Sequence, residues 1–143
     1  MNPTNPNYSA VIEFASKTLT GKQKAMLKDT TNALSLDELT KSKPIKDEAG
    51  NQVGLEPCTV VIDPDFYVVL GVHNEKSKDK DYKKYVIVDK SGTKYITGSE
   101  SLMRSFKDIL ADMEGEDEEY GIEVYRMPSK NYAGRDFLTC SIV

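Results

Sequence analysis

Five β-rich segments, with one helical segment between the third and the fourth, constrain the fold of this chain more than any other feature. Val, Ile, Tyr and Phe are enriched in these segments, and turn residues such as Gly, Pro, Asp and Asn separate them. The predicted strands cover residues 58–63, 66–73, 84–89 with an extension at 93–97, 121–127 and 135–143. Asp63-Pro64-Asp65 predicts a hairpin between the first two strands, and Lys90-Ser91-Gly92 predicts a tighter one after the third.

The segment between the third and fourth strands has the pattern of an amphipathic helix. Its apolar residues recur with helical spacing on one face, and Ser99 precedes them as a candidate N-cap. These apolar residues are Leu102, Met103, Phe106, Ile109, Leu110 and Met113. Gly115 and the acidic residues after it end the helix.

This order of elements is that of the oligonucleotide-binding (OB) fold, a five-stranded Greek-key barrel with a helix between strands three and four. We therefore predict a mainly β protein with helices (α+β), in which residues 57–143 form an OB-type barrel. A different small α+β sandwich would give the same order of segments and is the alternative. At 143 residues the chain is expected to form a single domain.

The first part of the chain is expected to add a tail and short helices to this barrel. Residues 1–14 are predicted to form a flexible N-terminal tail, and residues 15–143 the single domain. Within that domain, residues 20–39 fit one or two short helices with Thr20 or Ser35 as N-cap. Residues 41–56, with Pro and Gly, are predicted to be a loop.

Charge is distributed unevenly along the sequence. The net charge is −4, but five acidic residues between Glu114 and Glu119 account for it, since the rest of the chain sums to +1. Residues 74–94 carry seven lysines against four acidic residues. This region indicates either a solvated basic loop or a surface for an anionic partner.

An OB barrel binds ligands on the outer face of its second and third strands and at two adjoining loops. Single-stranded nucleic acid is held there by Lys and Arg at the phosphates and by aromatic rings stacked on bases. The candidate phosphate contacts are Lys84, Lys90, Lys94, Arg126, Lys130 and Arg135. The candidate stacking residues are Tyr67, Tyr85, Tyr95, Tyr125, Tyr132 and Phe137, although Tyr67, Tyr85 and Phe137 fit core positions equally well.

Catalytic and metal-binding patterns are weak in this sequence. His73 is the only histidine, and neither a phosphate-binding glycine loop nor a nucleophile elbow is present. The acidic block lacks the ligand spacing of a calcium loop, and Cys58 and Cys140 are expected to be reduced, buried thiols rather than a disulfide. We expect no enzyme activity, no cofactor and no metal. Without an apolar run of membrane-spanning length or a signal sequence, the chain is expected to be cytoplasmic and not bound to a membrane.

The strand order and the ending Tyr132–Val143 resemble small single-stranded-DNA-binding proteins encoded by conjugative plasmids and phages of Gram-positive bacteria. The resemblance covers residues 57–143 and implies an OB-fold protein that coats single-stranded DNA during plasmid conjugation, replication or establishment. Two features depart from bacterial single-strand-binding proteins: the chain ends in an apolar strand instead of an acidic tail, and it has no Trp.

We therefore expect non-catalytic binding of single-stranded DNA with low sequence preference; duplex DNA and RNA stay open as partners. We also expect a homo-oligomer in which the N-terminal tail docks on a neighbouring subunit through Tyr8, Val11, Ile12 and Phe14. The alternative function is a protein-interaction or self-assembly module of a mobile element that does not bind nucleic acid.

Overall fold

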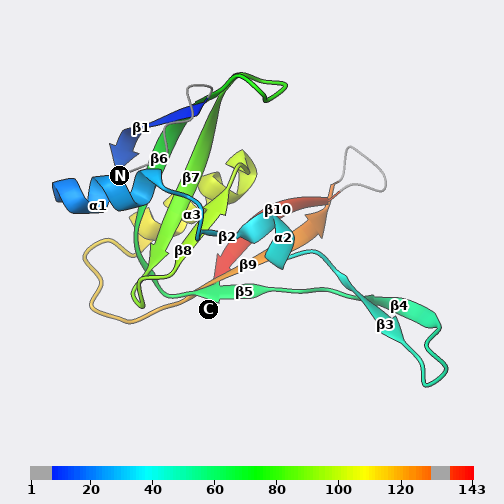
Figure 1. Ribbon diagram of the computed structural model, residues 1–143. Helices are drawn as coiled ribbons and strands as arrows, with labels where there is room; N and C mark the ends of the chain where they lie inside the picture. Colours follow the sequence, from blue (N-terminus) through cyan, green and yellow to red (C-terminus); the bar gives the residue numbers. More distant parts are fainter. Residues whose placement is uncertain (1–7, 130–135) are drawn as a thin grey trace. The chain divides into compact units, whose positions relative to one another are not determined.

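The computed structural model describes residues 8–129 and 136–143, which form two compact units (Figure 1). Unit 1 comprises the described residues up to Leu34 together with Pro64–Gly98. Unit 2 comprises Ser35–Asp63 and the described residues from Ser99 to Val143. The single domain predicted for residues 15–143 stays a prediction.

Unit 1 is built on a five-stranded sheet, of which only Ser35, the last residue of β2, is assigned to unit 2. The strands are β1 (Tyr8–Ala15), β6 (Pro64–Asn74), β7 (Asp81–Asp89), β8 (Lys94–Thr97) and β2 (Leu34–Ser35), in the order β1-β6-β7-β8-β2. The pairs β1–β6, β6–β7 and β7–β8 are antiparallel. Helix α1 (Gly21–Lys28) begins with a capping box in which the Thr20 side chain accepts from the backbone N–H of Gln23, so the predicted N-cap is confirmed.

One face of this sheet carries the core of unit 1. Strand residues point alternately to the two faces of a sheet. On one face, alternate residues of β6 and β7 pack together with Leu27 of α1. The buried members of this cluster are Leu27, Phe66, Val68, Leu70, Val72, Val86 and Val88, with Ile12, Tyr82 and Ile96 partly buried against it. The position of β1 therefore rests on burial as well as on backbone hydrogen bonds.

The N-terminal prediction differs from the structure at residues 8–14. They are predicted to be a flexible tail, whereas β1 pairs with β6 from Tyr8 to Ala15, with a register shift between Ile12 and Phe14. Ala10, Ile12 and Ala15 face the core, and this apolar alternation is enough to bind the strand to the sheet. Residues 1–7 lie outside the described residues.

The tight hairpin predicted after the third strand is confirmed as β7–β8. Its turn is closed by a hydrogen bond from the Asp89 N–H to the Thr93 carbonyl oxygen (3.0 Å) and another from the Gly92 N–H to the Asp89 carbonyl oxygen (2.8 Å). Gly92 has a φ of 91°, a left-handed conformation that costs little only for glycine.

Replacing Gly92 by Ala should therefore lower the free energy of unfolding by about 1–2 kcal/mol, because a Cβ is strained at this φ. Urea denaturation followed by circular dichroism measures the change. Gly98→Ala is the matched control, since Gly98 lacks a positive φ. Equal effects of the two substitutions would contradict the assignment of strain to the turn.

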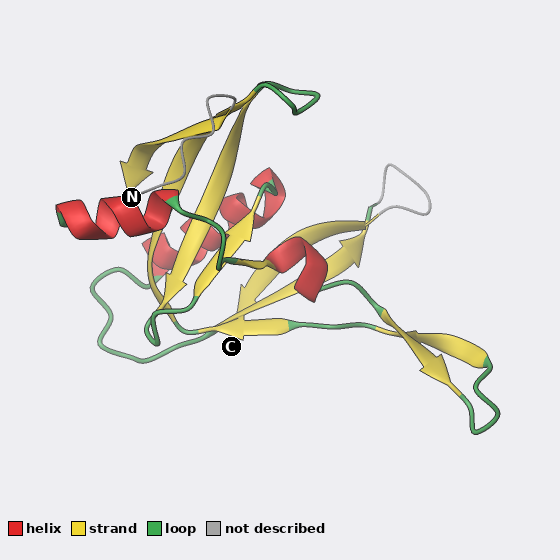
Figure 2. Cartoon of the chain, in the orientation of Figure 1, coloured by secondary structure: helices red, strands yellow, loops and turns green. Residues whose placement is uncertain are grey.

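Unit 2 contains a three-stranded sheet, a separate hairpin and two helices (Figure 2). The sheet has the order β10-β9-β5 and is formed by β10 (Asp136–Ile142), β9 (Ile122–Pro128) and β5 (Val60–Ile62). The helices are α2 (Leu36–Leu39) and α3 (Glu100–Asp112), and the hairpin is β3 (Lys43–Lys46) with β4 (Gln52–Glu56). The side chains of Ser35 and Ser99 accept from the backbone N–H of Glu38 and Leu102, so both predicted N-caps are confirmed.

Helix α3 packs along β10 and buries the apolar face that its periodicity predicted. Leu102, Met103 and Phe106 are almost completely inaccessible to solvent. The Ser101 hydroxyl donates to the Leu138 carbonyl oxygen (2.8 Å), which fixes the helix against the strand. Cys58 and Cys140 are both free, as predicted, and Cys140 of β10 is buried, which raises the pKa of its thiol to about 11. The predicted burial of Cys58 is wrong in degree, because this side chain is only partly buried.

Two local predictions about residues 41–73 are wrong. The loop expected over 41–56 contains the β3–β4 hairpin, because Gly50, with a φ of 85°, allows a turn between two pairing segments. The hairpin expected between 58–63 and 66–73 is absent: β5 pairs with β9, while β6 pairs with β1 and β7. After Asp63 the chain enters β6 directly at Pro64, and the register with β7 shifts between Pro64 and Phe66, next to a proline that has no N–H to donate.

The broader prediction of a mainly β protein with helices is confirmed. The described residues form three sheets and no closed barrel, so the closed five-stranded barrel is not what the structure shows. Among these residues, no helix combines the length and apolar composition needed to cross a bilayer.

Candidate functional site

The two units carry opposite net charge. By sequence, unit 1 has eleven lysines against seven acidic residues, which gives +4, and unit 2 has eight basic against sixteen acidic residues, which gives −8. The acidic residues 114–119, between α3 and β9, are exposed. Unit 1 therefore carries the sign of charge that suits an anionic ligand, although the total charge of the chain is negative.

The lysine-rich part of unit 1 lies at one end of strands β6 and β7. Residues 75–80, here called the lysine loop, join these strands and carry Lys76, Lys78 and Lys80. Lys80 is paired with Glu75 (3.3 Å), whereas no ion pair of Lys76, Lys78 or Lys83 is found among the described residues. Lys76, Lys78 and Lys83 are exposed, so their ammonium groups are available to phosphates.

Lys84 and Tyr82 share one face of β7, next to this loop. Lys84 is paired with Leu70 and Tyr82 with Val72, two positions on the core face of β6. The Lys84 Nζ lies 5.9 Å from the centre of the Tyr82 ring. A partly exposed ring beside a cation is the combination that holds a base and its phosphate. We use the name lysine surface for Lys76 and Lys78 of the loop together with Tyr82, Lys83 and Lys84 at the adjoining end of β7, where Lys83 points to the opposite face from Tyr82 and Lys84.

The sequence predicts Tyr67 and Tyr85 as stacking residues and does not single out Tyr82. Those two residues are 8% and 7% exposed, so their rings are not available for stacking on bases. Burial also raises the pKa of Tyr67, which keeps its hydroxyl neutral. The signal for Tyr82 was present, because it lies two residues from Lys84 and therefore on the same strand face.

The other predicted residues of unit 1 have varied environments. The Lys94 Nζ donates to the carbonyl oxygens of Met26 (3.1 Å) and Asp29 (2.9 Å). Its ammonium group therefore supplies hydrogen bonds to backbone carbonyl groups at the C-terminal end of α1. Lys90 is exposed in the β7–β8 turn, and Tyr95 is partly buried on β8. Burial and the Asp89 carboxylate raise the pKa of Tyr95.

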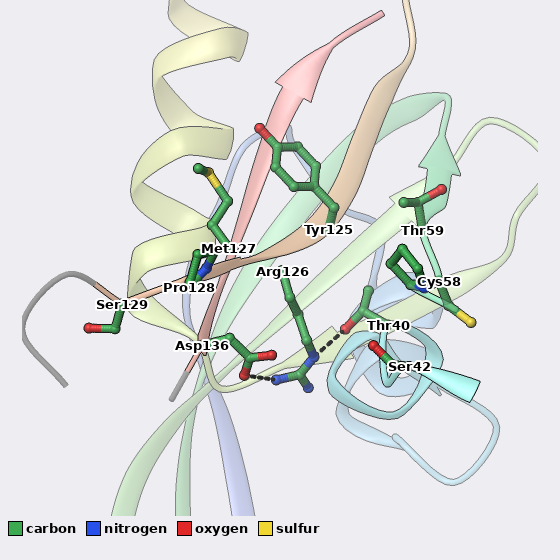
Figure 3. A pocket seen from close by; sticks show the side chains of 11 residues that line it. Thr40, Ser42, Cys58, Thr59, Tyr125, Arg126, Met127, Pro128, Ser129 and Asp136 are labelled. Atoms are coloured by element: carbon green, nitrogen blue, oxygen red, sulfur yellow. Dashed lines mark hydrogen bonds and ion pairs between the residues drawn. The ribbon is translucent and has the colours of Figure 1, made fainter. Parts of the chain in front are cut away.

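Arg126 in unit 2 forms part of a hollow of about 470 Å³ (Figure 3). Its Nε donates to the Thr40 Oγ1 (3.1 Å), its Nη2 to the Asp37 carbonyl oxygen (2.7 Å), and its Nη1 pairs with the Asp136 carboxylate (3.2 Å). These contacts join the end of α2 to β9 and β10. They favour a structural role over the predicted phosphate contact, because moving the guanidinium would leave Thr40 and Asp37 without their donor.

Tyr125 and Phe137 are brought to the same face of the β9–β10 pair. Tyr125 lies opposite Thr139 and Phe137 opposite Met127, so the two aromatic residues are diagonal neighbours. The Tyr125 hydroxyl is within 2.6 Å of the Ser141 Oγ, and Phe137 is 38% exposed. The predicted residues Lys130, Tyr132 and Arg135 lie outside the described residues.

The residues predicted to mediate oligomerisation lie on β1, and their role stays a prediction. Val11 and Phe14 are 60% and 51% exposed, and the Phe14 ring lies 5.6 Å from that of Tyr67. Ile12 is packed against the core of unit 1, which reduces its availability to a second subunit. The backbone of Tyr8 pairs with Asn74, but its side chain lies outside the described part of the structure.

Within the described residues, no group of three or more His, Cys, Asp or Glu side chains is arranged to hold a metal ion. No protein-family model matches the chain, and comparisons with curated proteins and with solved structures gave no match.

Proposed function

We propose that this protein binds single-stranded DNA without catalysing a reaction and with low sequence preference. The observation that carries the proposal is the separation of charge between the units, with +4 on unit 1 and −8 on unit 2. A net charge of −4 argues against the binding of an anion. The charge separation answers this argument, because phosphates respond to the local potential of the surface that they approach. RNA and duplex DNA are expected to compete to an extent set by the shape of the lysine surface.

The lysine surface supplies the two kinds of contact that unspecific single-strand binding needs. Lys76, Lys78 and Lys83 offer exposed cations, and Lys84 lies beside the partly exposed ring of Tyr82. Cations neutralise phosphates and release counterions, while the ring stacks on any base because every base has a π-face. Neither contact reads sequence.

We further propose an OB-type barrel in which residues 60–74 are together the first strand and β7, β8, β9 and β10 are the second to fifth, whereas the sequence predicted 58–63 and 66–73 as separate strands. Residues 60–74 are extended except at Asp63, and they pair first with β9 and then with β7. The first strand of an OB barrel pairs in the same way, with the fourth and the second strand. The helix α3 stands between the third and fourth of these segments, which also agrees with this topology.

We also propose that the protein acts in plasmid conjugation, replication or establishment. This part of the proposal rests on the family resemblance. Such processes expose single-stranded DNA transiently, and a coating protein with low sequence preference protects it. The proposed site of action is the cytoplasm, where these strands form.

The direct test is the fluorescence anisotropy of a labelled single-stranded oligonucleotide titrated with the protein at low and moderate salt. We expect binding whose logarithmic association constant falls linearly with the logarithm of the salt concentration. A duplex of the same sequence measures the preference for single strands. Absence of binding at low salt would overturn the proposal.

A protein-interaction module is the second candidate, and the β3–β4 hairpin favours it. Every residue of β3 is exposed, and on β4 Val53 and Leu55 are 64% and 61% exposed. Exposed apolar side chains on a two-stranded hairpin suit contact with another protein. This candidate predicts that oligonucleotides leave the hydrodynamic behaviour of the protein unchanged.

A further inference from the structure

His73, at the end of β6, is held between two carboxylates at the base of the lysine loop. Its Nδ1 lies 2.7 Å from the Asp81 Oδ1, and its Nε2 lies 2.6 Å from the Glu75 Oε1. Glu75 is the first residue of the loop, and Asp81 is the first residue of β7. The imidazole therefore ties the start of the loop to the residue that follows it.

Only the imidazolium form of His73 satisfies both contacts. A neutral imidazole has one N–H and one lone pair, so it can donate to one carboxylate while its lone pair faces the other. Hydrogen bonds to Asp81 and then to Glu75 raise the pKa of His73 above its ordinary value of 6.5, with partial burial opposing them. Bonds from His73 and Lys80 lower the pKa of Glu75, so this carboxylate stays ionised at neutral pH.

The other charged groups around His73 come from strands β1 and β7 and from the lysine loop. Glu13 of β1 and Lys83 of β7 line the same shallow hollow, of about 390 Å³, as His73 and Asp81. Lys80 contacts Glu75 from within the loop. The two carboxylates in direct contact with the imidazole favour the protonated ring over the neutral one.

Backbone hydrogen bonds make the loop a compact turn that this contact can close. The Asn74 N–H donates to the Lys80 carbonyl oxygen (2.7 Å), and the Ser77 N–H donates to the Asn74 carbonyl oxygen (3.0 Å). The Lys76 N–H donates to the Asn74 Oδ1 (3.0 Å). These bonds leave the Lys76 and Lys78 side chains on an ordered turn.

We infer that protonated His73 is a positioning residue for the lysine loop, and that DNA binding therefore weakens as pH rises through the titration of this ring. The inference rests on the proposed function. When the ring loses its proton, one carboxylate loses its donor, the loop loses a positive charge, and the lysines are no longer held in one arrangement.

The sign of the effect follows from the raised pKa of His73 in the folded protein. The stabilisation from this contact is fully present below about pH 6.5, the ordinary value, and is lost as pH rises through the raised value. By linkage, DNA that favours the closed loop should raise the pKa of His73 further.

The first arm of the test measures, without DNA, the contact of His73 with Asp81 and Glu75, which we call the latch. His73 is the only histidine, so its ring signals in heteronuclear NMR are assigned without ambiguity. We expect both ring nitrogens to be protonated at pH 6.5 and the ring to titrate above its ordinary pKa. Asp81→Asn should move the titration back towards that value, because it removes the largest cause of the shift.

The second arm measures DNA affinity by anisotropy between pH 6 and pH 9 at constant ionic strength. The wild-type affinity should fall about fivefold or more over this range, the lower end of ordinary coupling between two sites. His73→Gln, which cannot take up a proton, should flatten the profile. Lys78→Gln is the matched control: it removes one charge from the same loop and should lower the affinity while keeping the pH dependence.

The outcomes separate the two proposals. An unshifted titration of His73, or a pH profile that His73→Gln leaves unchanged, would overturn the latch while DNA binding stands. Absence of binding at every pH would overturn the proposed function together with the coupling, and the NMR arm would still decide whether the latch exists.

Discussion

Replacing Lys76, Lys78 and Lys83 together by Gln should weaken the binding of single-stranded DNA on the order of 10- to 100-fold at moderate salt. All three side chains are exposed on the lysine surface, and no ion pair holds them among the described residues. Each phosphate contact on a single strand contributes about 0.7 to the slope of affinity against salt, so the slope should become shallower by about 2. Anisotropy titrations at several salt concentrations measure both quantities.

The matched control is the triple substitution of Lys41, Lys43 and Lys46 by Gln. These lysines are also exposed, and their loss changes the net charge equally, but they lie on or beside the β3–β4 hairpin of unit 2. We expect this variant to keep the wild-type slope within about 0.5, because its lysines release no counterions from the bound strand. Equal losses in both variants would show that only total charge matters and would contradict the assignment of the lysine surface.

The second large effect concerns Phe106, whose side chain is 0% exposed in the centre of the apolar face of α3. Phe106→Ala should lower the free energy of unfolding by about 3–5 kcal/mol, through the lost burial of the ring and the cavity that it leaves. This is a large fraction of the total stability of a small protein. Urea denaturation at neutral pH measures the change.

Phe106→Leu is the control for this prediction, because it keeps most of the apolar volume and should cost less than about 1.5 kcal/mol. A loss below about 1 kcal/mol for Phe106→Ala would contradict the burial of the ring. DNA affinity of Phe106→Leu should equal that of the wild type, since this residue lies outside the lysine surface.

The tyrosines show what could be predicted from the sequence about the candidate site and what could not. Alternation along β7 correctly separates Tyr85 from Lys84, but it does not say which of the two faces is covered. Tyr85 and Tyr67 are buried, whereas Tyr82 lies on the core face near the start of β7 and stays partly exposed beside Lys84. The exposure of a strand residue depends on what packs against it, which is information from distant parts of the chain.

Lys94 and Arg126 illustrate the same limit for charged residues. Both fitted a phosphate contact by residue type, yet Lys94 donates to two carbonyl oxygens of the α1 end, and Arg126 to Thr40, Asp37 and Asp136. These acceptors are far away in sequence, so no local pattern could reveal them. Lysines without such partners, such as Lys76 and Lys83, therefore became the better candidates.

The sequence by itself determined the elements whose information is local. The N-caps Thr20, Ser35 and Ser99, the apolar face of α3 and the turn at Gly92 depend on residues within a few positions of each other. Only the tertiary structure decided that β1 joins the sheet, that β5 pairs with β9 and not with β6, and which strand faces are buried. The reason is that strand pairing and burial are non-local. The alternation of side chains along the sequence defines the two faces of a strand, but segments that are distant in sequence decide which strand pairs with each edge and which face is buried.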